Sequence, residues 1–283
     1  MQRETLLYQE VQYEVDGSAA VIQLNRPDRL NALTHKMLSE LRHAIGAAED
    51  DPRVVGIIVT GAGRGFSAGM DAQALAAGAR GERNLGASDN EFAVEPGDPK
   101  MGPEFGVTYA YLLKVRKPVI AAINGPVAGL GLAIAALCDL RFASETAVFR
   151  TAFAQRGLIA EHGASWILPR LVGPSRALDL MWHPRKVDAK EALAMGLVNR
   201  VVPGAELLRE AKTYIEEIAT WSSPASIKEM KQQVYRALQQ PLDVAMLEAN
   251  ARMAESFKRK DFAEGVGSFL ENRKPAFPRI GKS

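Results

Sequence analysis

The apolar segments in the first half of the chain have the length and composition of β-strands. Val54–Thr60 and Val119–Ile123 are nearly continuous apolar runs, which are typical of strands covered on both faces. Tyr8–Val15 and Ala19–Asn25 have strand character, and Asp16-Gly17 between them favours a hairpin. We therefore predict a sheet in which strands alternate with crossing helices.

Helical spacing dominates the rest of the chain. Thr34 is a candidate cap for a first helix, which ends near Asp50-Asp51-Pro52. Beyond Ala164, glycine and proline breaks separate further predicted helices: Ser175–Trp182, Ala189–Met195, Ala205–Ala219, Ala225–Leu238, Leu242–Phe257 and Asp261–Asn272. The pattern predicts an α/β fold, with a core over residues 1–200 and a helical region over residues 201–283.

One internal segment lacks any periodicity. Residues 76–106 mix six glycines and three prolines with charged side chains. This composition favours a mobile loop or lid over a packed element, and such a lid could cover a bound ligand.

Composition excludes several classes of function. The 35 basic and 33 acidic side chains give a net charge of +2, which does not indicate a dedicated nucleic-acid binder. The single cysteine, Cys138, cannot form an intrachain disulfide, and the first residues do not resemble a signal segment, so we expect a cytoplasmic protein. Residues 128–138 (AGLGLAIAALC) are too short to span a bilayer and predict a buried core helix.

Two glycine-rich turns follow the two apolar strands. Residues 61–71 (GAGRGFSAGMD) follow the first strand, and residues 124–131 (NGPVAGLG) follow the second and open the apolar helix. Two such junctions can direct free helix N-terminal N–H groups at one point, where they favour an anion. The alternative is that both are ordinary tight turns after buried strands.

The paired segments FSAGMD and NGPVAGLGLAIAALCDLRFAS resemble the signature of the enoyl-CoA hydratase/isomerase, or crotonase, family. The similarity covers nearly the whole chain, including Asn25-Arg26-Pro27 and Arg273-Lys274-Pro275; the segment 76–106 is unlike the pattern. The resemblance implies a crotonase-like (ββα)n spiral core, a C-terminal helical trimerisation region and an acyl-CoA substrate. It also implies assembly as a homotrimer or a dimer of trimers.

The resemblance also implies roles for individual residues. The backbone N–H groups of Met70 and Leu130 would hold the thioester oxygen, and loss of one such donor typically costs roughly a hundredfold to a thousandfold in rate. The expected contacts to coenzyme A are Arg29, Ala32, Ser67, Ala68 and Asp71, with Arg273 or Lys274 at a phosphate. No tightly bound cofactor is expected, because coenzyme A is part of the substrate, and the histidines and cysteine show no metal-ligand spacing.

The chain departs from the family at the two positions that carry glutamates in hydratases. Ala133 and Phe153 stand there, and neither can move a proton. Glu161-His162 offers a replacement, since a carboxyl group buried beside Trp166 could both take and return a proton. The alternatives are that Glu161 caps or pairs with the next helix, and that His162 is a structural histidine.

Three functions are compatible with these residues. The first is hydration of a 2-enoyl-CoA by a hydro-lyase in which Glu161 handles the water and the α-proton. The second is double-bond isomerisation of an enoyl-CoA or dienoyl-CoA, because a single carboxylate can move a proton between two carbons. Hydrolysis or C–C cleavage on the same scaffold stays open. The third is a non-catalytic paralogue that only binds acyl-CoA or a protein partner.

Overall fold

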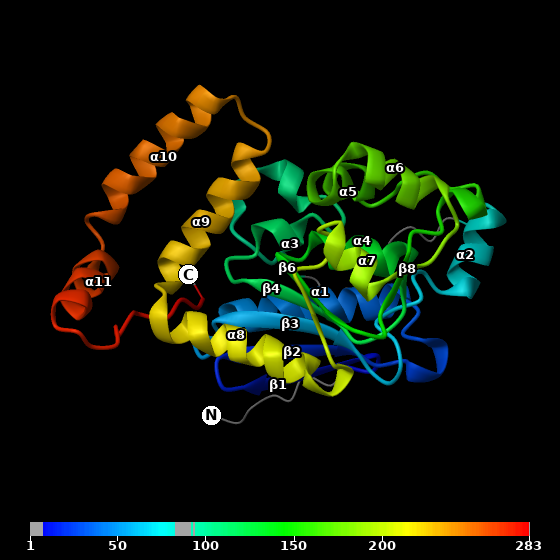
Figure 1. Cartoon of the computed structure of the whole chain (residues 1–283), viewed down its shortest axis with the longest axis horizontal. Coiled ribbons are helices and arrows are strands. Elements are labelled where there is room, and N and C mark those ends of the chain that lie inside the picture. Colours follow the sequence, from blue (N-terminus) through cyan, green and yellow to red (C-terminus); the bar gives the residue numbers. More distant parts are fainter. Residues whose placement is uncertain (1–7, 83–91, 93, 283) are drawn as a thin grey trace.

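A six-stranded sheet forms the centre of the molecule (Figure 1). The computed structural model describes residues 8–82, 92 and 94–282. The strand order is β1 (Val11–Asp16), β2 (Ala19–Leu24), β3 (Gly56–Gly61), β4 (Val119–Ile123), β6 (Leu140–Ser144) and β9 (Arg200–Val202). Within the described part of this sheet, β1 and β2 pair antiparallel through the predicted hairpin turn, and the other neighbouring strands pair parallel. Every residue of β3 and β4 is buried, which confirms the strands predicted from the two apolar runs.

Helices cover both faces of this sheet. Successive strand residues point to opposite faces, so each strand contributes to two separate cores. The larger core joins Ile57 and Val59 to side chains of α1 (His35–Asp50) and α4 (Gly129–Leu137). The smaller core joins Ile58 and Ile120 to apolar side chains of α8 (Leu207–Trp221). As predicted, the first helix follows Thr34, whose hydroxyl accepts the backbone N–H of Met37 at 3.0 Å.

The first strand begins later than the sequence pattern predicts. The predicted strand starts at Tyr8, whereas β1 starts at Val11. The backbone N–H groups of Gln9 and Glu10 donate to the Glu40 carboxylate of α1, at 2.9 and 2.8 Å. A side chain distant in sequence therefore replaces the sheet partner over these residues.

A second layer stands on the larger core. A three-stranded sheet contains β5 (Val127–Ala128), β7 (Val148–Arg150) and β8 (Val187–Asp188). The helices α5 (Ala164–Val172), α6 (Pro174–Trp182) and α7 (Ala189–Ala194) lie around it (Figure 1). All nine residues of α4 are buried, as predicted for the core helix.

The segment predicted to be a mobile loop is packed over much of its described length. Its start lies in α2 (Ala72–Ala79), and residues 94–106 contain two short 3-10 turns before α3 (Tyr111–Lys114). Met101 and Phe105 are buried in the larger core, so the prediction of an unpacked loop is wrong for residues 94–106. Residues 83–91 and 93 lie outside the described residues.

The C-terminal helices extend from the core to one side (Figure 1). They are α9 (Pro224–Ala237), α10 (Leu242–Ser256) and α11 (Lys260–Leu270). Because β9 belongs to the central sheet and α8 to its smaller core, this extended region begins at α9, later than the predicted residue 201. Within the described part of the chain, no helix combines the length and apolar character needed to cross a bilayer.

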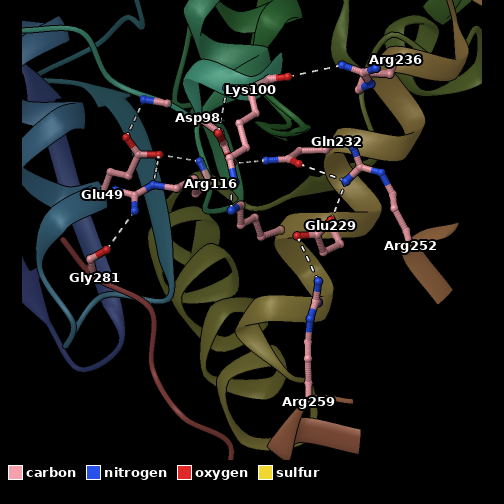
Figure 2. Close-up of polar contacts among 12 residues, drawn as sticks. Glu49, Asp98, Lys100, Arg116, Glu229, Gln232, Arg236, Arg252, Arg259 and Gly281 are labelled. Carbon is pink, nitrogen blue, oxygen red and sulfur yellow. Dashed lines mark hydrogen bonds and ion pairs between the residues drawn. The ribbon is translucent and has the colours of Figure 1, made fainter. Parts of the chain in front are cut away.

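Polar contacts hold α9 against the core. Lys231 Nζ lies 2.7 Å from Asp139 Oδ2, and the Tyr235 hydroxyl donates to Asp139 Oδ1 at 2.9 Å. Asp98 pairs with Lys228 at 2.8 Å and accepts a hydrogen bond from Gln232 at 2.9 Å. Figure 2 shows Asp98 and Gln232 between α9 and the segment that precedes α3. These contacts determine where the helical region leaves the core.

We expect Lys231→Met to lower the free energy of unfolding by about 3 kcal/mol, because Asp139 keeps its largely buried charge without its cation. Lys258→Met is the matched control, since Lys258 pairs with Glu255 at the exposed surface, where solvent screens the pair, and its loss should change stability far less. Urea denaturation at equal protein concentrations measures both variants. Equal losses in the two variants would contradict a dominant role for the Lys231–Asp139 pair.

Candidate active site

The first glycine turn is braced by buried polar side chains. The Asn31 amide donates to the carbonyl oxygens of Ala62 and Gly65, at 2.9 and 2.8 Å. The Ser67 hydroxyl donates to the Asn31 carbonyl oxygen at 2.8 Å and accepts the Gly69 N–H at 3.2 Å. Asn31 and Ser67 are fully buried, so they hold the backbone path rather than offer side chains to a ligand.

The two glycine turns lie directly against each other. The backbone N–H of Phe66 donates to the Pro126 carbonyl oxygen at 3.0 Å, and that of Ala128 donates to the Ser67 carbonyl oxygen at 2.9 Å. Gly69 has a φ of +91°, and a Cβ there would lie 2.8 Å from the Ala128 carbonyl oxygen and 3.4 Å from the Leu130 nitrogen. Only glycine permits this approach. The predicted meeting of two strand-to-helix junctions is confirmed.

The two predicted N–H donors come from these adjoining turns. Met70 lies between Gly69 and the start of α2, and Leu130 lies in the first turn of α4. Neither backbone N–H donates to any other residue that the structure describes. A helix N-terminus carries a partial positive charge, so Leu130 presents its free donor in a field that favours an anion.

The residues expected beside coenzyme A differ in exposure. Arg29 is exposed, Ala32 is buried, and Ala68 is half-buried.

Asp71 accepts the Gln73 N–H at the start of α2 and lies 3.0 Å from Arg26 Nη1. Burial acts to raise the pKa of Asp71, but the hydrogen bonds from Arg26 and the helix backbone outweigh it and hold the pKa below its usual value. Asp71 is therefore a charged carboxylate that already has partners.

Arg273 and Lys274 lie away from the two glycine turns within one chain. They follow α11, which stands at the opposite end of the molecule from α2 (Figure 1). Arg273 pairs with Glu264 and with Glu271, each at 2.6 Å. The Lys274 ammonium lies 5.7 Å from the centre of the Trp221 ring. The structure thus brings together the two turns that carry Met70 and Leu130 but does not bring the two C-terminal cations to them.

Glu161 and His162 form a partly exposed pair before α5. Glu161 Oε2 lies 3.4 Å from His162 Nε2, and their side chains are 33% and 30% exposed. The expectation of a buried Glu161 carboxyl group is therefore wrong. The interpretation of Glu161 as a helix cap is also wrong, because Gly163 occupies the cap position and no side chain caps α5.

His162 has an unusual backbone conformation. Its φ is +55°, which is uncommon for a residue other than glycine and is typical of tightly constrained sites. The ring packs edge-on against Tyr109, with centroids 5.2 Å apart. Partial burial lowers the pKa of His162, although the neighbouring Glu161 acts in the opposite direction.

A pocket of about 490 Å³ borders His162. Aromatic and aliphatic side chains make up most of its wall, including Phe105, Leu137 and Trp166, and Glu104 and Tyr109 add a carboxylate and a phenol. Burial and the charge of Glu161 raise the pKa of Tyr109 to about 12, so its hydroxyl keeps its proton at neutral pH. Sequence reasoning missed Glu104 and Tyr109, because they lie within or beside the segment interpreted as a loop.

The two positions at which the family resemblance expects glutamates are occupied here by buried apolar residues. Ala133 lies in the middle of α4, and Phe153 precedes a short 3-10 turn; both belong to the larger core. Cys138 is also buried, as predicted, and burial raises the pKa of its thiol to about 12. Among the described residues, no group of three or more histidine, cysteine, aspartate or glutamate side chains could hold a metal ion.

Comparison with known proteins relates the chain to a known enzyme family. Residues 14–279 match the model of the enoyl-CoA hydratase/isomerase family. The chain is 34% identical over 272 residues to a probable enoyl-CoA hydratase of Mycobacterium bovis, covering 96% of this chain and 99% of that protein. It is 35% identical over 266 residues to a short-chain-enoyl-CoA hydratase of Clostridium acetobutylicum, covering 92% and 94%.

Solved structures share the fold. An enoyl-CoA hydratase from Bacillus anthracis matches with a TM-score of 0.82 at 28% identity, covering 95% of this chain and 99% of that chain. An enoyl-CoA hydratase subunit from Geobacillus kaustophilus matches with a TM-score of 0.81 at 32% identity, covering 97% and 99%. These matches confirm the predicted crotonase-like α/β fold with its C-terminal helices. The chain therefore belongs to the enoyl-CoA hydratase/isomerase family of enzymes.

Proposed function

We propose that the protein hydrates a 2-enoyl-CoA thioester at the two glycine turns. The free N–H groups of Met70 and Leu130 on adjoining turns carry this proposal, because they are suited to an oxygen that gains negative charge. The similarity to proteins named enoyl-CoA hydratase, at 34% and 35% identity, supports the substrate class. Coenzyme A enters as part of the substrate, and the chemistry needs no further cofactor.

The proposed reaction uses one carboxylate twice. Glu161 accepts a proton from water as the water oxygen bonds to the β-carbon, and the electrons of the double bond move to the thioester oxygen as an enolate. Met70 and Leu130 donate hydrogen bonds to that oxygen. The enolate then collapses, its α-carbon takes the proton from Glu161, and the product is a 3-hydroxyacyl-CoA. The proton and the water atoms balance without a second acid.

Isomerisation is the second candidate, and one observation favours it. Both positions that carry glutamates in hydratases are occupied by buried apolar residues, so this chain has lost the pair that usually handles water. A single Glu161 can still remove a proton from one carbon and return it to another. The product mass separates the two reactions, because hydration adds one water and isomerisation adds none.

We expect Glu161→Gln to lower kcat by about a hundredfold to ten-thousandfold on a 2-enoyl-CoA, because the amide cannot exchange the proton. Glu206→Gln is the control, because Glu206 forms an exposed ion pair with Arg209 at the surface; this variant should keep full activity. Loss of the conjugated-thioester absorbance, with product mass, measures both variants across 2-enoyl-CoA and 3-enoyl-CoA thioesters. Unchanged turnover in Glu161→Gln would rule out Glu161 as the base. Binding of CoA without turnover of any thioester by the unmodified protein would favour a non-catalytic paralogue.

Activity should fall as pH decreases below about 6.5. The lowered pKa of His162 keeps the ring neutral at pH 7, and protonation occurs only below the ordinary value of 6.5. Once charged, the ring at 3.4 Å would hold the Glu161 carboxylate in an ion pair, and the carboxylate would no longer be free to accept a proton from water. His162→Gln should therefore move this acid limb of the kcat/KM profile to lower pH, whereas His183→Gln, at an exposed site, should leave it in place. An acid limb at the same pH in His162→Gln and in the unmodified protein would exclude this coupling.

We also propose assembly as a homotrimer or a dimer of trimers. The helices α10 and α11 expose large apolar side chains, including Leu247, Met253 and Phe269. Contiguous exposed apolar surface usually marks an interface. Light scattering should give about three or six times the chain mass of 30.7 kDa, and Phe269→Glu should reduce that mass. A monomer at micromolar concentration would contradict this assembly.

A further inference from the structure

The backbone around Met70 is held by a short parallel bridge. The Leu33 N–H donates to the Gly69 carbonyl oxygen at 2.8 Å, and the Asp71 N–H donates to the Leu33 carbonyl oxygen at 3.0 Å. These two bonds hold the residues immediately before and after Met70 and leave the Met70 N–H itself without a partner among the described residues. The direction of that N–H therefore depends on the bridge.

A single guanidinium ties the two sides of this bridge together. Arg26 Nη1 donates to the Ala32 carbonyl oxygen at 2.7 Å and to Asp71 Oδ2 at 3.0 Å. Ala32 immediately precedes Leu33 on one side, and Asp71 immediately follows Met70 on the other. The second carboxylate oxygen of Asp71 accepts the Gln73 N–H at 2.9 Å, which fixes Asp71 to the start of α2.

Arg26 is itself held in place. Its Nε lies 3.4 Å from Glu10 Oε1, and its backbone N–H donates to Asn31 Oδ1 at 2.9 Å. The Arg26 and Asp71 side chains are only 22% and 14% exposed. An ion pair in such a site is screened less by solvent than a surface pair is. This pair therefore connects the braced first glycine turn to the donor residue.

We propose that Arg26 and Asp71 are positioning residues that set the direction of the Met70 N–H toward the substrate oxygen. This inference rests on the donor role of Met70 in the proposed function. It also assigns Asp71 a role different from the coenzyme A contact expected from the family resemblance. A donor misplaced by about 1 Å can cost about a hundredfold in rate, because its hydrogen bond strengthens only as the oxygen gains charge.

The test compares Asp71→Asn, Arg26→Met and Arg26→Lys with Asp188→Asn. Asp71→Asn removes the charge but keeps an oxygen for the Gln73 N–H. Asp188 is a matched control, because it caps α7 by accepting the Glu191 N–H at 2.8 Å and lies outside the two glycine turns. We expect Asp71→Asn and Arg26→Met to lower kcat about tenfold to a hundredfold with KM changed less than about threefold. The double variant should be no slower than the slower single variant, because the pair acts as a unit.

A binding measurement separates positioning from chemistry. An arylacryloyl-CoA absorbs at longer wavelength when its thioester carbonyl is polarised, and this shift requires no turnover. Glu161→Gln should keep the shift, Asp71→Asn and Arg26→Met should lose most of it, and Arg26→Lys should restore part of it. Asp188→Asn should match the unmodified protein. Thermal unfolding of each variant shows whether it is folded, and Asp71→Asn decides the matter if Arg26→Met does not fold.

The absorbance shift and the kinetic constants distinguish the positioning role from the donor site itself. A red shift in the unmodified protein that persists in Asp71→Asn and Arg26→Met would overturn the positioning role while leaving the donor site intact. A raised KM with unchanged kcat in Asp71→Asn would also overturn it, in favour of direct contact with coenzyme A. No red shift in the unmodified protein would instead remove the donor site on which the proposed function depends.

Discussion

The candidate active site depends on the backbone contact between the two glycine turns. The parallel pairing of β3 with β4 brings the ends of these strands side by side, and Pro126 and Ser67 then join the turns through their carbonyl oxygens. Gly69 allows the turns to approach until a side chain would collide with Ala128. A small change in either turn would separate Met70 from Leu130, because both donors belong to the main chain. The buried Asn31 amide maintains this geometry from within the turn.

The features predicted correctly from the sequence are those determined by local pattern. The apolar runs identified β3 and β4, Thr34 identified the start of α1, and the glycines identified both turns. Contacts between distant segments explain the errors. The Glu40 carboxylate accepts backbone N–H groups of the first residues of the predicted opening strand. Phe105 is buried in the larger core, within residues 94–106, whose composition resembles a loop. No short-range pattern in the sequence predicts either of these contacts.

The same segment links the C-terminal helices to the pocket beside His162. Asp98 binds Lys228 and Gln232 of α9, and the residues shortly after it, including Glu104 and Tyr109, form part of the pocket wall. Since these contacts are polar and largely buried, they fix distance and direction more strictly than apolar packing would. The shape of the pocket therefore depends on how α9 docks, although α9 lies more than a hundred residues away in sequence.

The two parts of the proposed site differ in how firmly the sequence determines them. Main-chain donors require a particular backbone path, and that path requires glycine at Gly69 and buried polar braces at Asn31 and Ser67. An acid or base requires only a titratable side chain near the reacting atoms, so its position in the chain can change. Ala133 and Phe153 are consistent with this difference, because both lie in the apolar core while the two turns keep their backbone contacts. A sequence can therefore keep the glycine-turn signature of its family although the two positions at which the resemblance expects glutamates are apolar.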